Sequence, residues 1–356
     1  MKKKSLNAKK IIPSNLILDK YLKNKKIFKI YKDFEKNFKT INNPGKIAIS
    51  VSGGPDSMAL CFLVSCYAFK NNYKITSRFF LVDHGLRKNS SQEARIVKEK
   101  LKLNNINLKI LKWRGKKPIS NLQSLARNKR YQLIFNQCKK HNIKTVLTAH
   151  HQDDFYETFF SRLLRGSGTE GLSSFAEIKK NFCYKGQAIT VGRPLLNLNK
   201  ENLVYIAQNV FNFYIKDPSN DMEKFQRVRL RKLIKNMKNQ GLNFNKLKLT
   251  LRNLSSSNKA INEIVKNNIN DNVIFNQKKY IINFNFFLLP DEVIFRSLSI
   301  LIRKMSKKNY PPRGKKLMNL IKEIKSGSRI KATLGGTIIE KIHNSVVVTE
   351  EKTKKP

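Results

Sequence analysis

The sequence is poor in acidic residues. Its 356 residues hold 24 Asp and Glu against 72 Lys and Arg, which gives a formal net charge of +48. Codon bias explains many of the lysines but not the scarcity of acids. So large a positive excess predicts a polyanionic partner, with nucleic acid as the first expectation. The sequence also lacks the basic amphipathic helix or lipidation motif that a membrane-surface role requires.

Cysteines and long apolar runs are scarce as well. The four cysteines form no CxxC pair and no Cys/His cluster with zinc spacing, so we expect buried free thiols. They are Cys61, Cys66, Cys138 and Cys183. The longest apolar run, Met58 to Phe69, is too short to span a bilayer. The Lys-rich N-terminus has no signal-peptide core before Tyr31. We therefore expect a cytoplasmic protein without a membrane partner.

Apolar runs alternate with amphipathic stretches after residue 45. Strands are predicted at 46–52, 77–84, 107–113 and 145–150, and helices at 56–70, 90–103 and 121–142. This alternation predicts an α/β fold, a doubly wound parallel sheet covered by helices on both faces. Ligands of such sheets bind beyond the carboxyl ends of the strands.

The composition changes along the chain and predicts four parts. Residues 1–45 form a basic extension, a tail and a short helix, that ends in the turn signal NNPG, and 46–222 form the α/β domain. Residues 223–290 read as a lysine-rich helical domain, and 291–356 as a small C-terminal domain. Its last stretch, 327–351, alternates around a Gly-Gly turn, which is typical of a β unit.

The stretch SGGPDS, residues 52–57, follows the first predicted strand and precedes a helix. Gly53 and Gly54 allow a tight turn with bare amides, and the helix that begins near Asp56 points its positive end at the same place. The pattern predicts an anion site. It is neither a Walker A loop, since no Gly-Lys-Ser/Thr follows, nor a complete GxGxxG fingerprint. The alternative is a plain strand-to-helix turn with Asp56 as the N-cap.

A second polar cluster follows the fourth predicted strand. Asp153, Asp154 and Glu157 are three and four residues apart at the start of a helix, so they can serve one face. The alternative is that they complement the helix dipole. The adjacent His150 and His151 would point in different directions on any regular element, which argues against a metal pair. The aromatic residues between 155 and 160 are expected to be mostly core.

Several motifs occur in a fixed order across residues 46–231. They are SGGPDS (52–57), VDHGLR (82–87), LARNKRY (125–131), TAHHQDDFYETFFSRLLRGSGTEGL (148–172), RPLL (193–196) and DPSNDMEKFQRVRLR (217–231). The first resembles the pyrophosphate-binding loop of the PP-loop (N-type) ATP pyrophosphatase superfamily. Together they resemble the tRNA(Ile)-lysidine synthetase family.

The resemblance implies a reaction. ATP activates the C2 oxygen of the wobble cytidine in an isoleucine tRNA with a CAU anticodon, and free L-lysine then displaces AMP. The product, lysidine, changes the codon that is read from AUG to AUA. The resemblance further implies ATP and Mg²⁺ as cofactors and assigns tRNA binding to the helical part after residue 222.

The resemblance also assigns roles to residues. ATP is expected at Ser52, Gly53, Gly54, Pro55, Asp56, Ser57, Asp83, His84 and Arg127. The catalytic residues are expected to be Asp56, Arg127, Asp154 and Glu157. L-Lysine is expected at Asp154, Glu157 and Arg227, tRNA at Arg162 and Arg165, and Mg²⁺ at Asp56 and Asp153.

Other functions remain as alternatives. A 2-thiocytidine synthetase of the same superfamily needs paired cysteines, which this sequence lacks. An RNA-binding protein without catalysis would not need Asp56, Asp154 and Glu157. An amidotransferase-type synthetase would carry a glutaminase domain before the loop. The sequence leaves the oligomeric state open, with a homodimer as one option.

Overall fold

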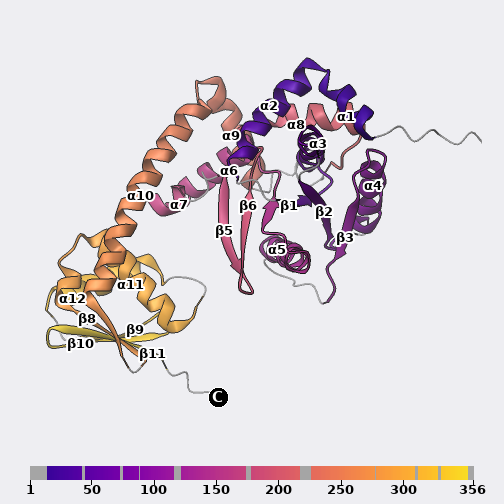
Figure 1. The fold of residues 1–356 in the computed structure, drawn as a ribbon. Helices are drawn as coiled ribbons and strands as arrows, with labels where there is room; N and C mark the ends of the chain where they lie inside the picture. Colours follow the sequence, from indigo (N-terminus) through magenta and orange to yellow (C-terminus); the bar gives the residue numbers. More distant parts are fainter. Residues whose placement is uncertain are drawn as a thin grey trace, which may run out of the picture. The chain divides into compact units, whose positions relative to one another are not determined.

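The computed structural model describes residues 14–41, 45–72, 75–87, 89–115, 122–173, 178–216, 226–276, 278–308, 312–327 and 330–351. The chain divides into two compact units, residues 1–248 and residues 249–356 (Figure 1). The helix α10 (Phe244–Asn272) runs across this division.

The first unit is built on a six-stranded sheet in the order β3-β2-β1-β4-β6-β5. Only β5 is antiparallel to its neighbour, and the other described pairs are parallel. The strands are β1 (Lys46–Val51), β2 (Thr76–Asp83), β3 (Leu108–Lys112), β4 (Thr145–Leu147), β5 (Lys179–Tyr184) and β6 (Gln187–Gly192). The helices are α1 (Ser14–Leu22), α2 (Lys25–Lys39), α3 (Pro55–Lys70), α4 (Ser90–Lys102), α5 (Leu122–Lys140), α6 (Gln152–Leu163), α7 (Thr169–Ser173), α8 (Lys200–Ile206), the π-helical turn η1 (Ala207–Phe211) and α9 (Gln226–Asn239).

The predicted α/β fold is confirmed, and the two faces of the sheet explain it. Ile47 and Ile49 of β1 pack into one core with α3, α4 and α8, whereas Ala48 between them packs into a second core with Phe135 of α5. Figure 1 shows α3 and α8 on one side of the sheet and α5 on the other. Strands buried on both faces are apolar at successive positions, which is why they stand out in the sequence. β4 ends at Leu147, three residues earlier than predicted.

Residues 14–41, predicted as part of a basic extension, form α1 and α2 within the first unit. The buried face of α2 carries Ile27, Tyr31, Phe34 and Phe38, which share a core with α3. The lysines of α2 lie on the opposite, exposed face of the helix. The charge of this segment therefore conceals an amphipathic pattern that the core requires. Residues 42–44 of the predicted turn NNPG and the stretch 217–225 lie outside the described residues.

The second unit holds an antiparallel sheet in the order β7-β8-β11-β10-β9. Its strands are β7 (Val273–Asn276), β8 (Lys279–Asn283), β9 (Lys331–Leu334), β10 (Thr337–Ile342) and β11 (Ser345–Glu350), with η3 (Phe284–Phe287), α11 (Asp291–Ser306) and α12 (Gly314–Lys325). The terminal β unit after residue 327 is present, with Gly335 and Gly336 in its turn at φ +66° and +87°. The domain boundaries at 222 and 290 remain predictions.

The cysteines do not all behave as predicted. Cys61, Cys66 and Cys138 are buried and free, and burial raises the pKa of the Cys138 thiol to about 12. Cys183 is exposed, so the expectation of burial is wrong there, because it lies on the edge strand β5. In the described part of the chain, no helix combines the length and apolarity needed to span a bilayer.

Candidate active site

The site lies where the strand order reverses. From β1 the chain first builds β2 and β3 on one side and then returns to add β4 on the other side. The carboxyl ends of β1 and β4 are therefore neighbours, and the connections that leave them diverge, which opens a crevice in doubly wound sheets. The SGGPDS loop and the start of α6 meet at this point.

The hydroxyl of Ser57 organises the loop. Ser57 Oγ accepts hydrogen bonds from the amides of Ser52 and Gly53, both at 3.1 Å, and donates to Gly54 O at 3.0 Å. The N-cap of α3 is Gly54 and Pro55 follows it, so the alternative with Asp56 as N-cap is wrong. The first helical bond runs from Met58 N to Gly54 O, so the amides of Asp56 and Ser57 lack a helical acceptor and are available to an anion.

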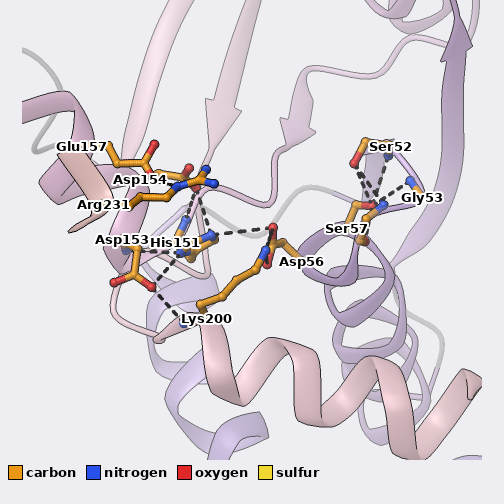
Figure 2. Close-up of polar contacts among 11 residues, drawn as sticks. Ser52, Gly53, Asp56, Ser57, His151, Asp153, Asp154, Glu157, Lys200 and Arg231 are labelled. Carbon is orange, nitrogen blue, oxygen red and sulfur yellow. Dashed lines mark hydrogen bonds and ion pairs between the residues drawn. The ribbon is translucent and has the colours of Figure 1, made fainter. Parts of the chain in front are cut away.

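Asp56 faces away from this loop toward the neighbouring strand end (Figure 2). Its two carboxylate oxygens lie 2.7 and 2.6 Å from Lys200 Nζ, and Oδ2 lies 3.6 Å from His151 Nε2. Lys200 begins α8, and His151 immediately precedes α6. Three segments that are distant in the sequence therefore meet at one carboxylate.

His151 caps α6 and determines the orientation of two acids. Its Nδ1 accepts a hydrogen bond from Asp153 N at 3.2 Å, while its own amide donates to Asp154 Oδ2 at 3.0 Å. Because Nδ1 is an acceptor, the proton of a neutral imidazole is on Nε2. Nε2 lies 3.4 Å from Asp154 Oδ2 and 3.6 Å from Asp56 Oδ2. The imidazole thus joins the loop acid to the helix acid.

Packing of α9 against α6 supplies two further cations. Tyr156 and Phe160 of α6 share a core with Leu230 and Ile234 of α9. This contact places Arg231 Nε 2.5 Å from Glu157 Oε1 (Figure 2), and the Glu157 side chain is buried.

Lys238, in the last turn of α9, lies 2.7 Å from Asp153 Oδ1 and 4.9 Å from the centre of the Tyr156 ring. The four carboxylates of Asp56, Asp153, Asp154 and Glu157 thus face three cations, Lys200, Lys238 and Arg231. Among these described side chains, the acids outnumber the cations by one negative charge. Among the described residues, Asp154 is the acid whose ion-pair partner is the imidazole of His151 rather than a lysine or arginine. This arrangement can accept one more cation.

The environment of Asp154 keeps it ionised. Burial would raise its pKa, but His151, His150 and the His151 amide outweigh burial and lower the pKa of Asp154 below the usual aspartate value. Burial lowers the pKa of His150 to about 4, although the charge of Asp154 acts to raise it. The His150 imidazole is therefore neutral near pH 7 and does not offset the negative charge of the acids.

Three of the residues predicted to bind ATP lie away from the SGGPDS loop, Asp83 and His84 at the end of β2 and Arg127 near the start of α5. Both oxygens of Asp83 accept hydrogen bonds, from Gly85 N at 2.9 Å and from Ser91 Oγ at 2.5 Å, which fixes the turn before α4. His84 contacts the Trp113 ring edge to face, with the ring centres 5.8 Å apart. Arg127 is exposed on α5 and close enough to His150 to help lower its pKa. These three residues therefore border the crevice without belonging to the acid cluster.

The predicted tRNA residues follow α6. Arg162 donates to the carbonyl oxygen of Gly171, and Arg165 donates to Ser161 O at 2.8 Å. Burial and the charges of Arg165 and Arg193 lower the pKa of the Arg162 guanidinium, so three arginines crowd one another here. Such a group of like charges favours phosphate. Arg227 lies on α9, but its side chain is outside the described residues.

A cavity of about 570 Å³ adjoins the acid cluster, and Asp153, Tyr156, Lys200, Lys238 and Phe244 contribute to its lining. The two acids predicted to bind Mg²⁺ both belong to this region, but each contacts a lysine. Within the described ranges no group of three or more His, Cys, Asp or Glu side chains could hold a metal ion. The residues suit a cation held by one or two carboxylates together with phosphate oxygens and water, which is the usual arrangement for Mg²⁺.

Sequence reasoning missed Lys200, Arg231 and Lys238, and it gave His151 no role. No signal in the local sequence marks Lys200 and Lys238, since each is one cation among 72, whereas Arg231 is the last residue of the motif DPSNDMEKFQRVRLR. A signal for His151 existed, because His151 and Asp154 together have the spacing of a capping box, although histidine is an uncommon N-cap.

Comparison with known proteins defines the class first. The PP-loop domain family matches residues 23–237, which include the sheet, the SGGPDS loop and the acid cluster. Among solved structures, the U34-tRNA thiolase NcsA from Methanococcus maripaludis, which carries a [4Fe-4S] cluster, aligns with a TM-score of 0.51 at 15% identity over 65% of this chain and 78% of that chain. At this identity the likeness concerns the fold.

The sequence relatives define the family. The tRNA(Ile)-lysidine synthase of Wolbachia pipientis wMel is 34% identical over 87% of this chain and 71% of its own length. That of Rickettsia typhi is 33% identical over 92% of this chain and 75% of its own length. The chain belongs to the tRNA(Ile)-lysidine synthase family.

Proposed function

We propose that this chain uses ATP to form lysidine on tRNA(Ile), through an adenylated tRNA intermediate and with free L-lysine as the second substrate. The observation that carries the proposal is the meeting of an anion-binding loop with four carboxylates at one strand edge. A protein that only binds RNA has no use for a negative cluster in so basic a chain. The alternative of a thiolase is disfavoured because three of the four cysteines are buried in the cores of α3 and α5.

In the first step, the C2 oxygen of the wobble cytidine attacks the α-phosphate of ATP, and pyrophosphate leaves. The free amides at the start of α3 and the residues Ser52 to Ser57 hold the phosphates, and Asp83, His84 and Arg127 border the nucleoside and the α-phosphate. Pyrophosphate is a better leaving group when donors already face the charge that develops on it. The Asp56 carboxylate, with Asp153 beside it, would hold Mg²⁺, which neutralises phosphate charge when bound.

In the second step, an amine of L-lysine attacks C2, and AMP leaves with the oxygen. Asp154 suits an ammonium group of this substrate because it is ionised, accessible and without a lysine or arginine partner among the described residues. Glu157 contributes to the same negative field, and Arg227 would pair with the lysine carboxylate. The attacking amine must also lose a proton, and one of these acids accepts it.

The tRNA is held by Arg162 and Arg165 near the site and by the lysines of the second unit. The crowding of Arg162, Arg165 and Arg193 supports a phosphate contact close to the reacting base.

The test is a three-component assay with radiolabelled L-lysine, ATP and tRNA(Ile) that carries the CAU anticodon. Retention of label on the tRNA only when ATP is present supports the proposal. Asp56→Asn is the matched control, because it removes one charge and keeps the side-chain shape. Transfer of sulfur in place of lysine, or tRNA binding without any ATP turnover, would refute the proposal.

A further inference from the structure

The SGGPDS loop holds phosphates without a lysine of its own. In Walker A loops, a lysine within the motif reaches the terminal phosphates of the nucleotide. Residues 52–57 contain neither lysine nor arginine. A loop of amides and hydroxyls alone leaves most of the charge of a leaving pyrophosphate uncompensated.

The fold brings a lysine to this loop from a distant segment. Lys200 lies 144 positions after Asp56 in the sequence, and its Nζ contacts both carboxylate oxygens of Asp56, at 2.7 and 2.6 Å (Figure 2). No local pattern marks Lys200, because it is simply the first residue of α8.

The backbone of Lys200 is held in place, whereas its side chain is accessible. Asn199 caps α8 by accepting from Asn202 N at 2.9 Å, and the Lys200 amide lies 3.4 Å from Asp153 Oδ2. The Lys200 side chain is 41% exposed and that of Asp56 is 23% exposed. Ion pairs this accessible contribute little to stability, about 0–1 kcal/mol. The ammonium can therefore exchange one anionic partner for another at small cost.

We propose that Lys200 is the phosphate-binding lysine of this loop, supplied from α8. Without nucleotide it neutralises Asp56, which would otherwise repel an incoming polyphosphate. When the phosphates of ATP bind the amides of Asp56 and Ser57, rotation about the bonds of the flexible Lys200 side chain brings its ammonium to the β- and γ-phosphate oxygens. The ammonium then stays with the pyrophosphate as it leaves. This inference rests on the proposed use of ATP.

The competing explanation is that Lys200 only neutralises Asp56 and does not contact a phosphate. The two roles differ in the Asp56→Asn background. There a purely neutralising lysine has nothing left to do, whereas a phosphate-binding lysine keeps its ligand.

The experiment measures the binding of inorganic pyrophosphate, ATP and AMP to the full chain by calorimetry. For Lys200→Met we expect pyrophosphate and ATP to bind on the order of 10-fold more weakly, with AMP unchanged, since a charge-assisted contact to phosphate is lost. Lys200→Arg should bind pyrophosphate nearly as well as the parent. Lys325→Met is the control for net charge, because Lys325 also pairs with an aspartate at 2.7 Å but lies in the second unit.

The double variant decides between the two roles. Asp56→Asn with Lys200→Met should bind pyrophosphate more weakly than Asp56→Asn alone. The inference is overturned if these two variants bind pyrophosphate equally well, or if Lys200→Met binds it as tightly as the parent. In either case, ATP binding by the parent chain would leave the proposed function standing. A parent chain that binds neither ATP nor pyrophosphate overturns both. Circular dichroism of each variant establishes that the fold is retained, and Lys200→Gln replaces any variant that does not fold.

Discussion

Replacing Gly53 by alanine should damage both the stability of the first unit and its ATP site. Gly53 has φ +85°, in the left-handed region that alanine adopts at a cost. A Cβ built on it would lie 2.7 Å from Val97 Cγ2 of α4 and 2.8 Å from Ile215 Cδ1. Gly53 O also accepts a hydrogen bond from Ile215 N at 2.9 Å, so the backbone cannot simply move away.

The expected magnitude has two parts. The left-handed conformation costs alanine about 1–2 kcal/mol, and forcing a methyl group into a packed contact costs about 1–3 kcal/mol. Together they predict a loss of about 2–5 kcal/mol, against a typical domain stability of about 5–15 kcal/mol.

Gly54→Ala is the matched control one residue further along. Gly54 has φ −71°, and its nearest heavy atom to a Cβ is Ser52 Oγ at 3.6 Å, an ordinary contact. Alanine at this N-cap should cost only about 0.5–1 kcal/mol. Urea unfolding followed by circular dichroism, together with ATP affinity, measures both variants. Equal stability of Gly53→Ala and Gly54→Ala would refute the assignment of Gly53 as a position of close approach.

Four further outcomes are expected. Asp56→Asn should abolish adenylation, measured as α-phosphate label retained on tRNA, without loss of fold; full adenylation would contradict the site. Glu157→Gln should still adenylate tRNA yet transfer lysine on the order of 100-fold more slowly, since loss of a charged partner costs a few kcal/mol; equal loss of both steps would place Glu157 with ATP instead. Burial raises the pKa of Asp83, but the hydrogen bonds from Ser91 and Gly85 lower it more strongly, so the net pKa is lowered. Ionised Asp83 therefore stabilises the fold above the ordinary aspartate pKa of about 3.9, and this stabilisation is lost as pH falls through the lowered value. The difference in unfolding free energy between the parent and Asp83→Asn should therefore shrink on acidification, and a constant difference from pH 7 to pH 2 would contradict this. Neutralising the exposed Lys304, Lys307 and Lys308 should reduce the salt slope of tRNA affinity by about 0.7–0.9 for each phosphate contact removed, and an unchanged slope would exclude them from the tRNA contact.

Local patterns were sufficient for the central fold and for the location of the site. The strands at 46–52, 77–84 and 107–113 are readable because buried strands and amphipathic helices differ in hydrophobic period, which is a property of neighbouring residues. SGGPDS and the acids at 153–157 are also local, and the topology rule for parallel sheets brings strand ends to one edge. The overall positive charge follows from composition alone.

Other features were hidden by composition. The sequence predicted one short helix before residue 45, and the basic residues of 14–41 concealed a second helix and an apolar face that belongs to the core of the first unit. In the second unit, β8 pairs with β11 in the register Ser345↔Asn283, and the short strands β7 and β8 resemble helix-flanking loops in the sequence. Strand pairing across such a separation depends on the whole sheet and not on the strand itself.

The partners of the site acids were decided by the tertiary structure. The sequence determined that acids, glycines and a helix start meet beyond β1 and β4, because motif spacing and strand direction require it. It could not determine that Asp56 meets Lys200 or that Glu157 meets Arg231, contacts that span 144 and 74 positions. Any of many lysines and arginines could satisfy a carboxylate. Which one does so depends on where the packing of α8 against α3, and of α9 against α6, places its side chain.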